Sequence, residues 1–189
     1  MGAHDVGDLF NLVAGTEQDR LNGEGNLAGN PIGVSSVQDF AAQLVGNGPI
    51  TGGVIYVGHG GSVPYPDGFY RPGLAPGEQS GPNTNIGTYN LSLLLGRELM
   101  SKASVTLRAC QVGYGGYYSF AKYMATQLNT NVYAPEAGMF FSLDPNSKAS
   151  GAPADTPAIP LNATKPIYLL QAFGKPLKCF SPLGSPACQ

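Results

Sequence analysis

Two residues of the sequence, His59 and Cys110, are of types that together perform acyl-transfer chemistry. A cysteine attacks as its thiolate, and a nearby imidazole promotes that ionisation and protonates the leaving amine. Both residues follow an apolar run and are bordered by small residues, in GHGG (58–61) and RACQVG (108–113). Glycine in such turns lets a substrate backbone approach closely. The pair therefore predicts nucleophilic catalysis by a cysteine.

The segments before these residues must bring the two side chains together. VIYV (54–57) is continuously apolar, as expected of a central strand covered by helices on both faces, and 104–113 repeats the pattern. NVYAPEAG (131–138) is a third strand candidate. Strands that alternate with helices predict an α/β fold with a mostly parallel sheet and a site outside the carboxyl ends of its strands. The residues at those ends are His59, Cys110 and Glu136.

Three segments have the apolar spacing of amphipathic helices, namely 34–46, 90–103 and 116–131. In the first, Ser35 or Ser36 can cap the amino end. Its buried face is expected to consist of Val37, Phe40, Ala41 and Leu44. The face of the third is expected to consist of Tyr117, Phe120, Ala121, Met124 and Leu128.

Other segments are assigned from their composition. DLFNLVAG (8–15) is a short apolar run that ends in glycine and predicts a first strand, and the polar stretch 16–33 predicts a loop. Residues 62–88, rich in Pro, Gly, Tyr and Asn, predict a long loop. Four tyrosines are expected to pack in the core and to form a wall of the site: Tyr114, Tyr117, Tyr118 and Tyr123.

The length of 189 residues predicts one domain over 1–189. Its core is expected over about 8–141. Residues 142–189 form a loop-rich C-terminal extension, in which 166–173 is expected to be an edge strand.

The balance of charges argues against a nucleic-acid partner. The net charge is −2, charged residues make up 12% of the chain, and Lys and Arg do not cluster. No apolar run approaches the roughly 20 residues that span a bilayer, so membrane insertion is not expected. The amino terminus lacks the pattern of a signal peptide, but a domain cut from a larger secreted polypeptide would look the same, so location stays open.

The cysteines and histidines do not predict a metal centre or a disulfide scaffold. With three cysteines and only His4 and His59 as histidines, no set of ligands has the spacing of a zinc site. Cys179 and Cys188 lie in a Pro/Gly-rich tail, either as a local disulfide or as two free thiols. No cofactor is expected.

The apolar strand followed by His-Gly and the apolar strand that ends in Ala-Cys resemble the caspase-like cysteine peptidases, over roughly residues 50–140. The 51 residues from His59 to Cys110 are close to the caspase spacing of about 50. The resemblance implies a three-layer α/β/α sandwich with a mostly parallel central sheet. The chain departs from true caspases because Arg108-Ala109-Cys110 stands in place of their Gln-Ala-Cys.

By this resemblance Cys110 is the nucleophile and His59 the general acid and base. The backbone N–H groups of Gly60 and Cys110 would form the oxyanion hole. Substrate specificity would come from side chains near the strand ends. Glu136 could pair with a basic substrate residue, and Arg71 or Arg108 could instead receive an acidic one.

The resemblance implies a cysteine endopeptidase that cuts a protein or peptide substrate. It further suggests a toxin or effector domain, secreted or delivered within a larger polypeptide, whose producing cell makes a cognate immunity or inhibitor protein. Two alternatives stay open. The same His-Cys pair could perform deamidation or deubiquitination, or the fold could be a non-catalytic module that uses residues 62–88 to bind a partner protein.

Overall fold

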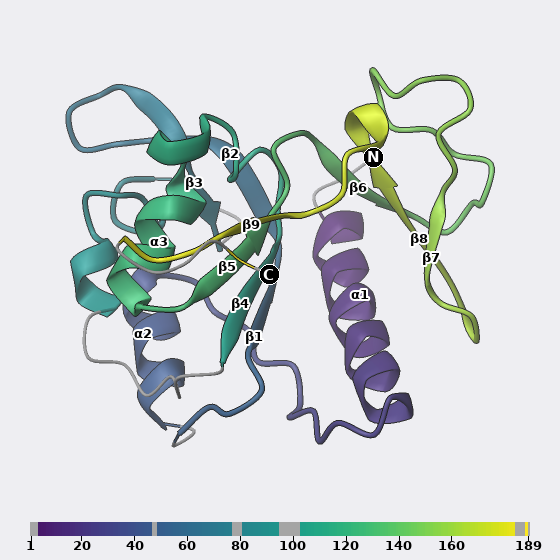
Figure 1. Cartoon of the computed structure of the whole chain (residues 1–189), viewed down its shortest axis with the longest axis horizontal. Coiled ribbons are helices and arrows are strands. Elements are labelled where there is room, and N and C mark those ends of the chain that lie inside the picture. Colours follow the sequence, from purple (N-terminus) through teal and green to yellow (C-terminus); the bar gives the residue numbers. More distant parts are fainter. Residues whose placement is uncertain (1–3, 47–48, 77–80, 95–102, 184–187, 189) are drawn as a thin grey trace. The chain divides into compact units, whose positions relative to one another are not determined.

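Figure 1 shows the computed structural model of the chain, which describes residues 4–46, 49–76, 81–94, 103–183 and 188. The fold is of the α/β class, with a mostly parallel sheet, as the sequence predicts. The chain divides into two compact units. The main unit comprises 34–137 and 176–189, and the small unit comprises 1–33 and 138–175. The expected core of 8–141 crosses this division, and the single domain stays a prediction.

In the described residues, the sheet of the main unit has four strands in the order β1-β4-β5-β9. They are β1 (Val54–Val57), β4 (Ser104–Arg108), β5 (Asn131–Ala134) and β9 (Lys178–Phe180). The first three are parallel, and β9 is antiparallel to β5. The predicted strands 54–57, 104–113 and 131–138 are thus present, the last two only over 104–108 and 131–134, and the second of them is central. The first is not central: β1 is an edge strand of this sheet.

One face of this sheet carries the hydrophobic core. Val105 and Leu107 of β4 are fully buried, as are Val132 and Ala134 of β5, while the residues between them are only partly buried. The helices α2 (Val37–Gly46) and α3 (Phe120–Leu128) cover this face, as Figure 1 shows. The alternation of burial along the strands indicates that the opposite face is less completely covered.

A serine side chain caps the start of each helix, and α3 begins at Phe120, later than the predicted 116. The Asp39 N–H donates to Ser36 Oγ at 3.1 Å, so Ser36 rather than Ser35 caps α2. All four residues expected on its buried face are buried. In α3, Ser119 Oγ accepts from the Lys122 N–H. The expected face of this helix is correct except for Tyr117, which precedes α3 in the short 3₁₀ helix η2 (Gly116–Tyr118) and is exposed.

The predicted loop 62–88 contains a hairpin that the sequence analysis missed. Strands β2 (His59–Pro64) and β3 (Tyr70–Ala75) pair in an antiparallel register. Both strands contain glycine and proline, which are unfavourable inside strands, so the strand pattern is not visible in the sequence. Of the predicted helix 90–103, Leu91–Leu94 is the 3₁₀ helix η1, and 95–102 lie outside the described residues.

The small unit corrects two predictions. The predicted strand 8–15 and the start of the predicted loop 16–33 form the helix α1 (His4–Gly23). Its buried face continues from the apolar Val13 to the polar Thr16 and Glu17, which hides the helical period. Thr16 Oγ donates to the Leu12 carbonyl, and the Arg20 guanidinium donates to Glu17 at 2.8 Å.

The predicted extension 142–189 also holds more strands than expected. A second sheet has the order β6-β8-β7, with β6 (Met139–Ser142), β7 (Ile159–Asn162) and β8 (Lys165–Gln171). The segment predicted as an edge strand at 166–173 is therefore mostly the central strand of this sheet, and it continues into the 3₁₀ helix η3 (Ala172–Gly174). Helix α1 packs on β7 and β8.

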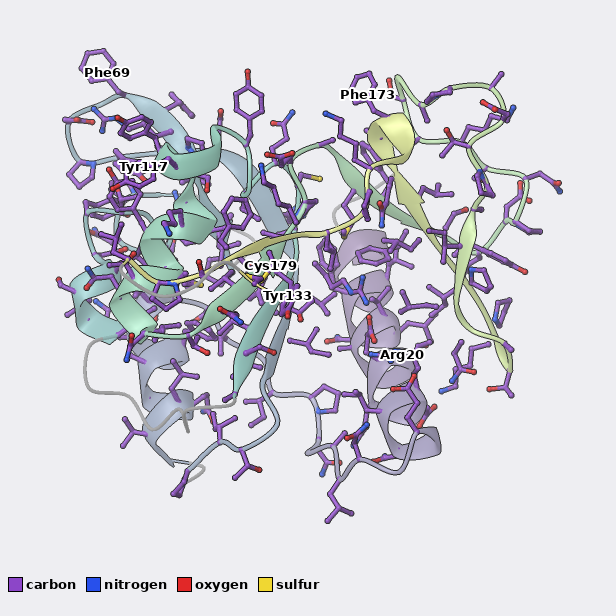
Figure 2. The ribbon with its side chains drawn as sticks, viewed as in Figure 1. Arg20, Phe69, Tyr117, Tyr133, Phe173 and Cys179 are labelled. Carbon is purple, nitrogen blue, oxygen red and sulfur yellow. A yellow bond between two sulfur atoms is a disulfide. The ribbon has the colours of Figure 1, made fainter. Side chains whose placement is uncertain are left out.

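The two cysteines of the tail form a disulfide, Cys179–Cys188, which settles the alternative that the sequence left open. Cys179 lies on β9, opposite Tyr133 of β5, and Figure 2 shows these two residues near each other. The disulfide therefore closes the tail onto the last strand of the main sheet. Cys110 is not part of this disulfide.

We expect a denatured, non-reduced sample to show one reactive thiol per chain and a reduced sample to show three, because only Cys110 lies outside the disulfide. The measurement is thiol alkylation read by mass spectrometry. Replacing both Cys179 and Cys188 by Ser should lower the free energy of unfolding by about 2–3 kcal/mol, since the disulfide closes a short loop. Three reactive thiols without reduction would contradict the pairing.

Candidate functional site

The parallel pairing of β1 with β4 sets the relative position of His59 and Cys110. Val57 lies opposite Arg108, and the Gly58 N–H donates to the Arg108 carbonyl at 3.3 Å. His59 and Cys110 both lie two residues beyond the ends of these strands. When the same register is continued, His59 comes level with Cys110. The strand ends are where the sequence predicted these residues.

Gly60, the second residue of β2, packs closely against the turn that holds Cys110. A Cβ built on Gly60 would lie 2.7 Å from the Ala109 Cβ and 3.0 Å from both the Cys110 carbonyl oxygen and Val112 Cγ1. Real Cβ atoms essentially never approach below 3.0 Å, so a side chain here would require the backbone to shift. The chain after His59 therefore packs directly against the chain around Cys110, which requires glycine.

Alternation along the strands places His59 and Cys110 on one face. Tyr56 and Leu107 point into the core, so Val57 and Arg108 lie on the opposite face of the sheet. Ala109 returns to the core at 2% exposure. Continuing the alternation past β4 assigns Cys110 to the less covered face. Gly60 contacts Ala109, which points into the core, so the preceding residue His59 is assigned to the less covered face as well. Cys110 is half-buried and His59 is exposed.

Tyr56 of β1 holds the backbone of His59 by a hydrogen bond. The Tyr56 hydroxyl donates to the His59 carbonyl at 3.2 Å. Burial raises the pKa of Tyr56, so its hydroxyl keeps its proton as a donor across the physiological range. A Cβ on Gly58 would lie 2.7 Å from this hydroxyl, which explains the glycine before the histidine.

The residue after the cysteine has an unusual backbone conformation. Gln111 has a φ of 56°, in the left-handed region that costs a non-glycine residue about 1–3 kcal/mol. Two hydrogen bonds hold it there: its N–H donates to the Ala137 carbonyl at 3.0 Å, and its carbonyl accepts from the Tyr114 N–H at 3.0 Å. The turn that presents Cys110 is therefore sharp and held from both sides.

Glu136 lies next to this turn. The Gly113 N–H donates to the Pro135 carbonyl at 2.9 Å, which, with the bond from Gln111 to Ala137, aligns the chain around Glu136 with the cysteine turn. Its carboxylate pairs with Lys178 of β9, with 2.8 Å between Oε1 and Nζ. The structure thus brings Glu136 to the strand ends as predicted, and its charge is already neutralised by a lysine of the same chain.

The two predicted arginines occupy different places. Arg108 ends β4, on the same face as the candidate pair. Arg71 lies opposite Val63 on the hairpin, four residues along β2 from His59, which corresponds to about 13 Å. Its guanidinium pairs with Asp67 at 2.7 Å and stacks over the rings of Tyr65 and Phe69. The structure therefore does not bring Arg71 to the pair.

No known family, curated protein or solved structure matches the chain. The resemblance to the caspase-like peptidases therefore stays a prediction. Within the described ranges, no helix has the length and hydropathy to cross a bilayer. In the same residues, no three or more His, Cys, Asp and Glu side chains are grouped so that they could hold a metal ion.

A cavity of about 260 Å³ lies beside the cysteine turn. It is lined by Gly61, Ser62, Pro72, Gln111 and Tyr114. Sequence reasoning did not select Ser62 or Gln111 as site residues. Their only signal is position, because Ser62 follows GHGG and Gln111 follows the cysteine. The hairpin that carries Ser62 and Pro72 to the cavity was not predicted.

The tyrosines expected in the core are exposed instead. Tyr117 and Tyr118 belong to η2, whose geometry breaks the helical spacing before Ser119. The exposed fractions of Tyr114, Tyr117, Tyr118 and Tyr123 are 68%, 62%, 77% and 44%. Core packing was therefore wrong for all four, although Tyr114 lines the cavity and so forms a wall. Figure 2 shows Tyr117 near the turn that precedes α3.

Replacing Gly60 by Ala should lower the free energy of unfolding by about 1–3 kcal/mol, because the new methyl group overlaps Ala109. The matched control is Gly52→Ala, since a Cβ at Gly52 meets no atom within 4 Å. It should change stability by less than about 0.5 kcal/mol. Chemical denaturation measures both. Equal stability of the two variants would contradict the contact between the histidine and cysteine turns.

Proposed function

We propose that the main unit is a cysteine endopeptidase of the caspase-like kind, with Cys110 as nucleophile and His59 as general acid and base. The observation that carries the proposal is the register of β1 and β4, which pairs Val57 with Arg108 and, continued by two residues, sets His59 level with Cys110. The close contact of Gly60 with Ala109 supports it, because it joins the two turns directly.

In the proposed reaction, the Cys110 thiolate attacks the carbonyl carbon of a peptide bond and forms a tetrahedral oxyanion. The C–N bond then breaks, and the His59 imidazolium gives its proton to the leaving amine. This leaves a thioester between substrate and Cys110. Water, deprotonated by His59, attacks the thioester, which releases the new carboxyl end and restores the cysteine sulfur.

The oxyanion would be held by the backbone N–H groups of Gly60 and Cys110. One such donor contributes about 3–4 kcal/mol to transition-state stability. Gly60 lies in β2 and packs against the turn that holds Cys110, which supports this role, because donors fixed before the reaction need no reorganisation during it. The strained, doubly held Gln111 supports it further, since such residues concentrate at functional sites.

The three-layer sandwich is part of the proposal. In the described residues of the main unit, α2 and α3 cover one face of the sheet, and the proposal requires a second layer on the other.

The site would act on proteins of a target cell as an effector or toxin domain. The disulfide Cys179–Cys188 supports exposure to an oxidising compartment, where disulfides persist. A cognate immunity or inhibitor protein would cover the cavity.

A second candidate function is a protein-binding module that uses the hairpin β2–β3. Phe69 and Tyr70 next to its turn are 66% and 69% exposed, and Figure 2 shows Phe69 pointing away from the hairpin. Exposed aromatic residues at a loop tip are typical of binding surfaces. In this case Cys110 and His59 would have no catalytic role.

The native chain should cut a diverse peptide library, and Cys110→Ala and His59→Ala should each lower the rate of cutting at least a hundredfold, since each removes a partner of the proposed proton and acyl transfer. Mass spectrometry of the products measures this. His4→Ala and the double variant Cys179→Ser, Cys188→Ser are the matched controls, because they remove the same residue types elsewhere in the chain. Both controls should keep the cuts.

A folded native chain that makes no cuts would overturn the peptidase. A mass shift of glutamine peptides without a cut would indicate deamidation by the same pair. Cuts that persist in Cys110→Ala would assign them to a contaminant or another site.

A further inference from the structure

We infer that the cavity beside Cys110 receives the substrate side chain next to the scissile bond, and that it selects an uncharged, hydrogen-bonding side chain such as glutamine or asparagine. This rests on the proposed peptidase function. It differs from the specificity expected from the sequence, which placed Glu136, Arg71 or Arg108 against a charged substrate residue.

The cavity lies next to the backbone of Cys110 and is lined by the residue that follows it, Gln111. A Cβ built on Gly61, one of its lining residues, would be 3.8 Å from the Cys110 carbonyl oxygen and 3.8 Å from Gln111 Oε1. Gly61 has a φ of 122°, a conformation that favours glycine, and as a glycine it leaves this side of the cavity without a side chain. A substrate whose carbonyl carbon meets Cys110 has its nearest side chain on the residue that carries that carbonyl. The adjoining cavity is therefore the place for that side chain.

The size of the cavity fits one side chain. Its volume of about 260 Å³ is below the range of about 300–1,000 Å³ of pockets that enclose drug-sized ligands. Pro72 and the Tyr114 ring give it apolar walls. Tyr114 is 68% exposed, so the cavity is open to solvent and can admit a side chain of an extended peptide.

The lining chemistry is neutral. Ser62 and Tyr114 provide hydroxyl groups, and Gln111 provides a carboxamide, so donors and acceptors are both present and no lining residue carries a charge. A carboxamide side chain of a substrate can use both kinds of group. A lysine, arginine, aspartate or glutamate side chain would lose hydration there and gain no opposite charge.

Arg71 and Glu136, two of the residues that the sequence placed against a charged substrate residue, are paired within the chain. Arg71, next to Pro72 in sequence, pairs with Asp67, and this hydrogen bond lowers the pKa of the Asp67 carboxyl. Glu136 pairs with Lys178. Within the lining of the cavity, the polar side-chain groups that determine the preference are the hydroxyl groups of Ser62 and Tyr114 and the carboxamide of Gln111.

The first experiment uses peptides that are identical except at the residue before the scissile bond, which is Gln, Leu, Lys or Asp. Cleavage by the full native chain is measured as kcat/KM. We expect the glutamine peptide to exceed the lysine and aspartate peptides at least tenfold, with leucine between. A preference for a charged residue, or equal cleavage of all four, overturns the cavity assignment while the peptidase function stands.

The second experiment changes the charge of the cavity. Ser62 is exposed on the hairpin, so substitution should keep the fold, which circular dichroism checks. Ser62→Asp should raise kcat/KM for the lysine peptide at least tenfold, and the matched variant Ser62→Lys should do so for the aspartate peptide. Unchanged preferences in both variants overturn the inference.

The third experiment removes the carboxamide without straining the turn. Gln111→Gly suits the left-handed backbone and should lower kcat/KM for the glutamine peptide more than for the leucine peptide. Gln111→Asn keeps an amide in a residue that tolerates this conformation and should restore part of the difference. If the native chain cuts none of the peptides, the peptidase function fails and this inference fails with it.

Discussion

The parallel register between β1 and β4 is the constraint on which the candidate site depends. Each strand ends in a turn, and the register determines which residues of the two turns meet. A shift by one residue would move Cys110 to the core face, because side chains alternate along a strand. Val105 and Leu107, both fully buried, prevent that shift, because it would expose them and bury their polar neighbours. The core therefore fixes the site as well as the fold.

Hydrogen bonds around His59 and Cys110 further fix the geometry that the strand register sets. The Tyr56 hydroxyl holds the carbonyl of His59, and the N–H of Gln111 is held by Ala137 beyond β5. The Ala121 N–H donates to the Val112 carbonyl at 3.0 Å, which connects the start of α3 to the same turn. Three elements distant in sequence thus converge on the residues around Cys110. Such support is what a preorganised site requires, because its geometry must be set before a substrate arrives.

The sequence was informative where short-range patterns determine structure. The apolar runs before His59 and Cys110 are strands, and the spacing of Val37, Phe40 and Leu44 is that of a buried helix face. It was less informative where the pattern is mixed. Helix α1 was missed because its buried face changes from Val13 to the polar Thr16 and Glu17, which are stabilised by local hydrogen bonds and by Arg20. The left-handed backbone of Gln111 has no signal in the sequence, because its N–H donates to the carbonyl of Ala137, which is 26 residues away.

The late position of β9 in the chain has a consequence for synthesis. β5 ends at Ala134, whereas its antiparallel partner begins at Lys178, after the whole 138–175 segment of the small unit. At about 5–20 residues per second, a ribosome needs roughly 2–9 s to make the intervening residues. During that time the outer edge of β5 lacks the partner that finally covers it, and such edges favour pairing with other chains. The nascent chain thus passes through a period in which this edge is open to such pairing. The ion pair between Glu136 and Lys178 can form only when that period ends.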